Sequence, residues 1–310
     1  MIDIPLHSRY AIYCILALLV IATGTRLLLK YRHPEKDYTE LRQRIQSWWW
    51  MIGILLAMLL ASQTMAITFF GFLSFLALKE FFSIVPTRQA DRRVLFWAYV
   101  AIPVQYYWIA TGWYGMFLVF IPVYVFLFLP MRAVLIGETQ GFIQALGTVH
   151  WGVMLCVFCI SHIAYLLVLP VENAAAGGIG LVLFLLFITE FNDVCQYVWG
   201  KLLGRHKIIP KVSPKKTWEG FIGGLITVTL ASGFVAPLLT PLSREEGFVG
   251  GAIIAVSGFV GDVVLSSVKR DLHIKDSGTL IPGHGGILDR IDSLIYTAPL
   301  FFHYLRYLHY

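Results

Sequence analysis

The residues best suited to chemistry lie in two polar stretches of the C-terminal half. One of them, residues 266–293, holds four aspartates, four basic residues and the glycine-dense turn 282–286. Carboxylates hold hard divalent cations, basic side chains bind phosphate oxygens, and glycines let backbone N–H groups approach a ligand closely. This stretch therefore predicts a site for a metal ion and phosphate. His284 has no second His or Cys at ligand spacing, which disfavours zinc.

The other polar stretch, residues 200–220, is strongly basic. Its six cations fall within 16 residues: Lys201, Arg205, Lys207, Lys211, Lys215 and Lys216. Thr217 is suited to cap a helix that starts there, although Glu219 stands one position too early for a capping box. A phosphate at such an N-terminus would meet free N–H groups. The alternative is a cytoplasmic anchor that binds acidic lipid headgroups.

Two apolar segments place ionisable side chains next to these stretches. Glu190 and Asp193 share one helical face with Tyr197, and Asp262 shares another with Ser266 and with Lys269, beside Arg270. Ionisable residues at membrane depth are costly and mark functional sites by default. The alternative, strongest for Glu190, is that an acid near a helix end only reaches interfacial water.

The elements that must position these residues are transmembrane helices. Hydrophobic residues make up 58% of the 310 residues and charged residues 14%, and the mean hydropathy is +0.73. A soluble chain of this size could not cover its surface with so few charged residues. A soluble enzyme, a disordered protein and a nucleic-acid binder are therefore poor interpretations. We expect an all-α, polytopic membrane protein and no nucleic-acid partner.

Apolar stretches long enough to cross a bilayer predict about ten spans, or nine if residues 48–82 form one tilted helix. A break near Ser62 and Gln63 is favoured, because a single helix would place two basic loops on opposite sides. The expected spans are 10–29, 48–61, 64–83, 94–110, 113–129, 149–169, 178–200, 220–240, 248–268 and 292–308.

The basic residues orient these spans. Of the 24 Lys and Arg residues, 21 fall in alternate loops, and only Arg9, Arg244 and Arg306 fall on the other side. The positive-inside rule then places the basic loops in the cytoplasm and both termini outside. We expect one integral membrane domain, 1–310, with hydrophobic N-terminal helices over 1–185 and catalytic helices and loops over 186–310.

The pattern S-x-x-K-R-x4-K-D-S-x2-L-x-P-G-H-G-G-x-L-D-R-x-D, from Ser266 to Asp292, resembles the signature of the phosphatidate cytidylyltransferase (CDP-diacylglycerol synthase) family. An upstream run from Asp193 through residues 213–217 to Gly220 is similar to that family's preceding block, in the same order and spacing. The specific resemblance covers about residues 190–293.

The resemblance implies that CTP and phosphatidic acid react at a bacterial inner membrane, on its cytoplasmic side, to give CDP-diacylglycerol and pyrophosphate. It implies Mg²⁺ held by Asp262 and Asp289, and leaves open a second, monovalent cation and a homodimer. The expected catalytic residues are Asp262, Asp289, Lys269 and Arg270. The residues expected to bind CTP and the lipid phosphate are Asp193, Lys201, Ser213, Pro214, Lys215, Lys216, Thr217, Lys275, Asp276, His284, Gly285, Gly286 and Arg290.

One departure from the family lies beside Asp193. Cys195 and Gln196 stand where the family commonly has smaller residues, which leaves open a different lipid phosphate as acceptor. A CTP-dependent lipid kinase is the nearest alternative and would release CDP instead of pyrophosphate. A transporter is disfavoured because we see no inverted repeats, and an inactive lipid-binding scaffold because the aspartates are intact.

Overall fold

The computed structural model describes residues 4–170, 172–173 and 175–310 and is all-helical over them, which confirms the expected fold class. Two of its long helices contain a π-helical turn in the middle, η2 (Phe120–Val125) and η3 (Met154–Cys159). The main helices are α1 (Leu6–Arg32), α2 (Thr39–Ala61), α3 (Gln63–Ile84), α4 (Arg92–Ala110), α5 (Tyr114–Val119), α6 (Phe126–Val134), α7 (Phe142–Val153), α8 (Ile160–Tyr165), α9 (Gly177–Leu203), α10 (Trp218–Leu239), α11 (Arg244–Asp271) and α12 (Leu288–His309).

Side-chain caps fix where several helices begin. The Ser62 hydroxyl accepts the Met65 N–H and starts α3 directly after α2, which confirms the predicted break. The Thr217 hydroxyl accepts the Gly220 N–H at the start of α10, as predicted. Ser243 and Glu246 form a reciprocal capping box at α11. Short polar signals in the sequence therefore set these boundaries.

Eight helical segments of the described chain are long and apolar enough to cross a membrane. The two further predicted spans correspond to α4 and α12, which fall outside those eight. Helix α2 contains the expected span 48–61 but begins earlier, at Thr39. Its first turns are polar, so a search for apolar stretches misses them. The protein is a polytopic integral membrane protein.

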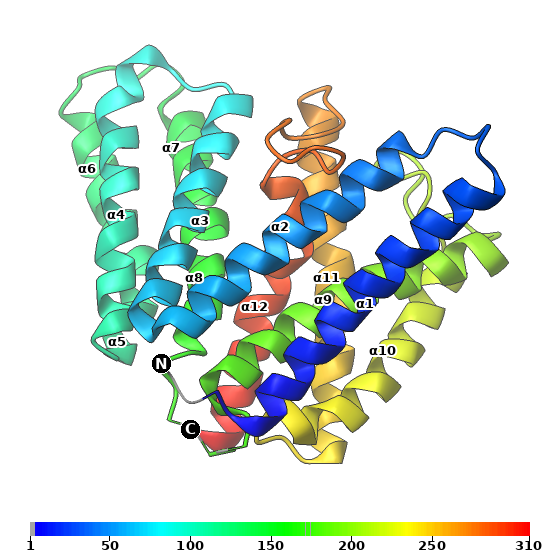
Figure 1. Ribbon diagram of the computed structural model, residues 1–310. Helices are drawn as coiled ribbons and strands as arrows, with labels where there is room; N and C mark the ends of the chain where they lie inside the picture. The colour runs from blue at the N-terminus through cyan, green and yellow to red at the C-terminus, as the bar shows by residue number, and fades with distance from the viewer. Residues whose placement is uncertain (1–3, 171, 174) are drawn as a thin grey trace.

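The helices form two groups (Figure 1). Helices α3–α8 form one bundle, α9–α12 pack against one another in sequence order, and α1 and α2 cross the second group. The start of α1 and the C-terminus lie at one end of the molecule, and the loop between α11 and α12 lies at the other. The boundary expected at residue 185 falls inside α9, which is continuous from Gly177 to Leu203.

Small residues bring the site-bearing helices into close contact. A Cβ atom on Gly220 of α10 would lie 2.8 Å from the Gln196 carbonyl oxygen of α9. A Cβ atom on Gly261 of α11 would lie 2.5 Å from the Asp292 carbonyl oxygen of α12. Such close backbone approach is typical of helix pairs in membranes. It sets Asp262, the next residue of α11, beside the first turn of α12.

Candidate active site

A cleft of about 1360 Å³ opens where α2, α9, α11 and the two polar loops meet. Most of the residues predicted for the site line it, although they come from separate parts of the sequence. The predicted residues that line the cleft are Asp193, Lys201, Ser213, Lys215, Lys216, Thr217, Asp262, Lys269, Lys275, Asp276, His284, Gly285, Asp289 and Arg290.

Two lysine–aspartate pairs cross the cleft and join its helices. Lys216 Nζ lies 2.6 Å from Asp262 Oδ2, and Lys269 Nζ lies 2.8 Å from Asp289 Oδ1. Each ion pair joins residues from different elements, so it fixes the start of α10 to α11 and the end of α11 to α12. The side chains are mostly shielded from solvent, with exposed fractions of 20% and 25% in the first pair and 14% and 5% in the second.

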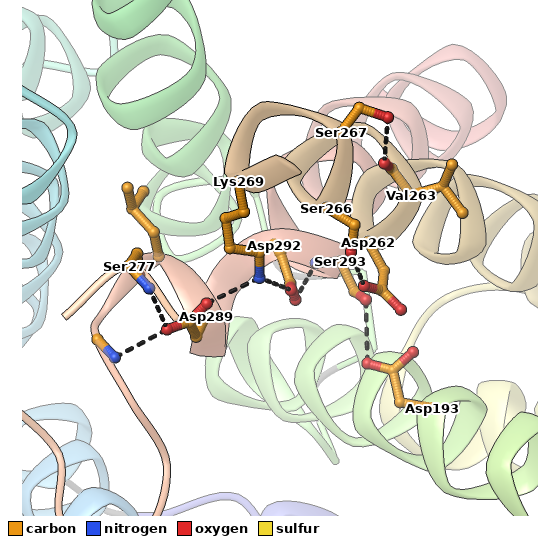
Figure 2. A network of polar contacts seen from close by, with 12 residues as sticks. Asp193, Asp262, Val263, Ser266, Ser267, Lys269, Ser277, Asp289, Asp292 and Ser293 are labelled. Carbon is orange, nitrogen blue, oxygen red and sulfur yellow. Dashed lines mark hydrogen bonds and ion pairs between the residues drawn. The ribbon is translucent and has the colours of Figure 1, made fainter. Parts of the chain in front are cut away.

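Asp289 is also held by the backbone of the glycine-rich loop (Figure 2). Its Oδ2 accepts hydrogen bonds from the N–H groups of Ser277, at 2.8 Å, and Gly286, at 3.0 Å. With Lys269 on the other oxygen, this carboxylate is oriented from three sides. Hydrogen bonds to an ionised carboxylate are stronger than neutral ones, so the orientation is firm.

Further carboxylates surround the Asp262 side of the cleft. Asp193, Asp262 and Asp292 lie close enough for their negative charges to repel one another, and Figure 2 shows the three side chains grouped around Ser293. Ser293 Oγ donates to Asp193 Oδ2 at 3.0 Å. The other oxygen, Asp193 Oδ1, is buried without a hydrogen-bond partner in the described part of the chain. An orphaned, negatively charged oxygen in this position favours a bound cation.

The donor set fits Mg²⁺ in the way that this ion is usually bound. Among the described residues, no three His, Cys, Asp or Glu side chains form a ready-made metal cage. Mg²⁺ commonly takes only one or two carboxylates and completes its shell with water and substrate phosphates. Asp262 with its carboxylate neighbours satisfies that requirement.

Unused hydrogen-bonding groups also face the cleft from the loop side. Arg290 Nε and His284 Nδ1 are buried and lack a partner within the described residues. Burial, followed by the positive charges of Arg290 and Arg44, lowers the pKa of His284 from its ordinary value of 6.5, so the ring is neutral at pH 7. Unpaired buried polar atoms are costly unless a ligand satisfies them, and an anion suits the Arg290 Nε–H donor.

Three of the predicted residues are placed differently. Arg270 turns away from Lys269, because consecutive helical residues point about 100° apart. Its Nε donates to the Val212 carbonyl and its Nη1 to the Ile274 carbonyl, so it links the two polar loops. This position differs from the expected contact with substrate phosphates. Pro214 lies in a tight turn closed by the hydrogen bond from Lys216 N to Ser213 O.

Gly286 is the third of these residues. Its N–H donates to Asp289, and a Cβ atom there would clash with the carboxylate of Glu80. The absence of a side chain at this glycine lets a carboxylate of the protein approach closely, and its contact with a phosphate stays a prediction. Gly285, with φ of +84° and Asp289 Oδ2 2.5 Å from the position of a Cβ atom, does line the cleft.

The sequence interpretation missed the contribution of the N-terminal helices. The polar first turns of α2 bring Glu40, Arg44 and Trp48 to the cleft. The Trp48 ring meets the His284 ring edge-on at 6.0 Å, and Ser47 Oγ donates to the Pro282 carbonyl. The single usable signal was the pair of charged residues Glu40 and Arg44, spaced i, i+4 just before an apolar run.

Fold and site together define a class: an all-helical membrane protein with a charged cleft at one end of its helices. The profile of the cytidylyltransferase family matches residues 42–308. The chain therefore belongs to the cytidylyltransferase family and is a nucleotidyltransferase. The match extends well beyond residues 190–293, which carried the resemblance in the sequence, and includes α2 and α3.

Individual relatives agree with this membership. The chain is 46% identical over 291 residues to the uncharacterized protein YnbB of Escherichia coli, covering 94% of this chain and 96% of that protein. It is 35% identical over 151 residues to a phosphatidate cytidylyltransferase of Staphylococcus saprophyticus, and 39% identical over 138 residues to one of Mycobacterium leprae. These two matches cover 46% and 44% of this chain, and 56% and 43% of those proteins, about half their length.

Proposed function

We propose that the protein is a CTP:phosphatidate cytidylyltransferase that makes CDP-diacylglycerol and pyrophosphate. The observation that carries the proposal is the cleft's pairing of carboxylates with lysines, next to buried donors that have no partner in the described chain. Two polyanionic substrates need such mixed charge, because cations must screen their mutual repulsion while carboxylates hold a metal ion.

In the proposed reaction, an oxygen of the lipid phosphate attacks the α-phosphorus of CTP. A new P–O bond forms, the bond between the α- and β-phosphates breaks, and pyrophosphate leaves with the bonding electrons. The lipid phosphate is ionised near neutral pH, so the reaction needs no side-chain nucleophile. The protein's contribution is to position the two phosphates and to stabilise the developing charge.

The position of each residue in the cleft indicates whether it would bind phosphate or metal. Lys216 and Lys269 exchange part of their contact with Asp262 and Asp289 for phosphate oxygens, and Arg290 donates its unpaired Nε–H to an anion. Asp262 and Asp289 are the proposed metal residues, with Asp193 and Asp292 beside Asp262. A Mg²⁺ ion held by these carboxylates would supply positive charge to the reacting phosphates.

The arrangement of the loops supports a cytoplasmic site in a bacterial inner membrane. The loops that carry 21 of the 24 Lys and Arg residues are those that the positive-inside rule assigns to the cytoplasm. The cleft is built from two of these loops. CTP would then reach the cleft from water and the lipid phosphate from the adjacent leaflet.

Incubation of the purified protein with CTP, Mg²⁺ and a panel of lipid phosphates tests the proposal. We expect phosphatidic acid to give CDP-diacylglycerol and an equal amount of pyrophosphate, and EDTA to stop both. Turnover with another lipid phosphate but none with phosphatidic acid would replace the proposed acceptor. Such a result would point to the side chains of Cys195 and Gln196, which follow Asp193 on α9.

A further inference from the structure

Glu80 lies near the end of α3 and contacts the 277–288 loop, which joins α11 to α12 in the other helix group. Its Oε2 accepts the Ile287 N–H at 2.8 Å, and its Oε1 accepts the Leu288 N–H at 3.0 Å and the Ser277 hydroxyl at 2.5 Å. These partners lie about 200 residues further along the chain. One carboxylate therefore joins α3 to the loop and to the first turn of α12.

These contacts supply a helix cap that α12 lacks. The residue at its N-cap position, Ile287, has no side chain that can cap the helix. The first N–H groups of any helix have no partner inside the helix, and a negative charge there is favoured by the helix dipole. Glu80 provides both the acceptors and the charge from outside.

Two glycines make room for this carboxylate. A Cβ atom on Gly278 would lie 3.2 Å from Glu80 Oε2, and one on Gly286 would clash with the whole carboxylate. Neither glycine has a positive φ, so each backbone conformation is open to other residues. The absence of a side chain at Gly286 is therefore explained by space for Glu80.

The same short segment orients Asp289. Ser277 contacts Glu80 through its hydroxyl and Asp289 through its N–H, and Gly286 donates to Asp289 directly before the Glu80-bound N–H of Ile287. The carboxylates of Glu80 and Asp289 therefore both accept hydrogen bonds from this loop. A shift of the loop away from Glu80 would withdraw both N–H donors from Asp289.

We propose that Glu80 is a positioning residue that sets the orientation of Asp289, and so of the Lys269–Asp289 pair, through the 277–288 loop. This inference rests on the proposed cytidylyltransferase function for its kinetic consequence. Its structural consequence, a loop fixed by α3, is independent of the substrate. The bundle of α3–α8 then has a role in catalysis although it supplies no group that touches the reacting atoms.

The kinetic test uses Glu80→Gln, which keeps the side chain's size but replaces one acceptor oxygen with a donor. We expect kcat to fall by about 10- to 100-fold, the usual cost of losing a partner that orients an active-site group. The KM values for CTP and lipid should change less than about threefold, because Glu80 does not contact the cleft's ligands. Glu138→Gln is the matched control and should leave kcat unchanged, since Glu138 accepts a local hydrogen bond from Gln140 N and does not line the cleft.

Amide hydrogen exchange provides a readout that does not depend on turnover. In Glu80→Gln, we expect faster exchange confined to residues 277–288, with α3 and α9 unchanged. Exchange that rises evenly over α3–α8 would show a general packing defect and overturn the proposal. Unchanged exchange in 277–288 would also overturn it. If wild-type protein makes no CDP-lipid, the proposed function fails, while this measurement still decides the loop's dependence on Glu80.

A second variant guards against misfolding of Glu80→Gln. Gly286→Ala places a methyl group against the Glu80 carboxylate and should lower kcat, and Glu80→Ala removes the obstacle. The proposal predicts that Gly286→Ala costs at least about tenfold less in the Glu80→Ala background than in wild type, because neighbouring sites couple. Equal costs in both backgrounds would contradict direct contact between these positions.

Discussion

The two helix groups of this protein contribute in different ways. Helices α9–α12 carry carboxylates and lysines near their ends and pack through glycines, whereas α3–α8 are filled with aromatic residues such as Phe70, Phe81 and Phe117. In the proposed function, α9–α12 and their loops supply the groups that meet substrate. Helices α3–α8, together with α2, hold these loops in place. A site whose motifs lie in one third of the chain can therefore still depend on contacts with the rest of the chain.

The largest expected effect is that of removing charge from the C-terminal carboxylates. Asp262→Asn or Asp289→Asn should abolish CTP- and Mg²⁺-dependent turnover, a loss of about 10³-fold or more, because each amide weakens metal binding and frees a lysine. Steady-state assays of detergent-purified variants measure it, with size-exclusion profiles as the control for folding. Near-normal activity in both variants would contradict the assignment of Asp262 and Asp289 as metal ligands.

A smaller loss should follow from breaking the link between α10 and α11. In Lys216→Met, Asp262 loses its 2.6 Å partner, and Gln196 Oε1 loses the ammonium that lies 3.3 Å away. We expect kcat/KM to fall by about 10²-fold. Lys211→Met, in the same basic loop but without a lining position, should stay within about twofold. Equal losses in both variants would show that only the loop's total charge matters.

Charged residues of α2 should affect the binding of CTP more than the chemical step. Arg44→Ala removes a cation from the rim of the cleft, where Arg44 also pairs with Glu40 at 2.6 Å. We expect the KM for CTP to rise about three- to fivefold at low salt, and less at high salt, because rim charges are screened. Arg42→Ala is the control on the same helix. A large fall in kcat with unchanged KM would place Arg44 among the reacting groups instead.

The smallest effect concerns His284, whose ring contacts Trp48 of α2. Its lowered pKa means that the folded protein binds fewer protons than the unfolded chain as the pH falls through about 6.5, so acid destabilises the fold. His284→Asn should remove this part of the pH dependence, so that Tm falls less between pH 7 and 5.5 in the variant than in the wild type. Identical Tm shifts in wild type and variant would contradict it. Between pH 7 and 9, the two activity profiles should have the same shape.

The sequence predicted local features well and distant partners poorly. The break at Ser62, the cap at Thr217 and the facing positions of Asp262 and Lys269 follow from helical spacing and capping chemistry. Glu80 falls near the end of the expected span 64–83, but its partners could not be predicted, because they are set by how two helix groups pack. Arg270 shows the limit of motif reasoning, since adjacent helical residues point in different directions.

The most direct test of cytidylyl transfer uses CTP labelled either at the α-phosphate or at the γ-phosphate. The labelled CTP is given to the purified protein with Mg²⁺ and phosphatidic acid. We expect that only the α-label enters the lipid, while the γ-label leaves as pyrophosphate, and that Asp262→Asn stops both. Transfer of the γ-label to lipid, with release of CDP, would show a lipid kinase and contradict the account.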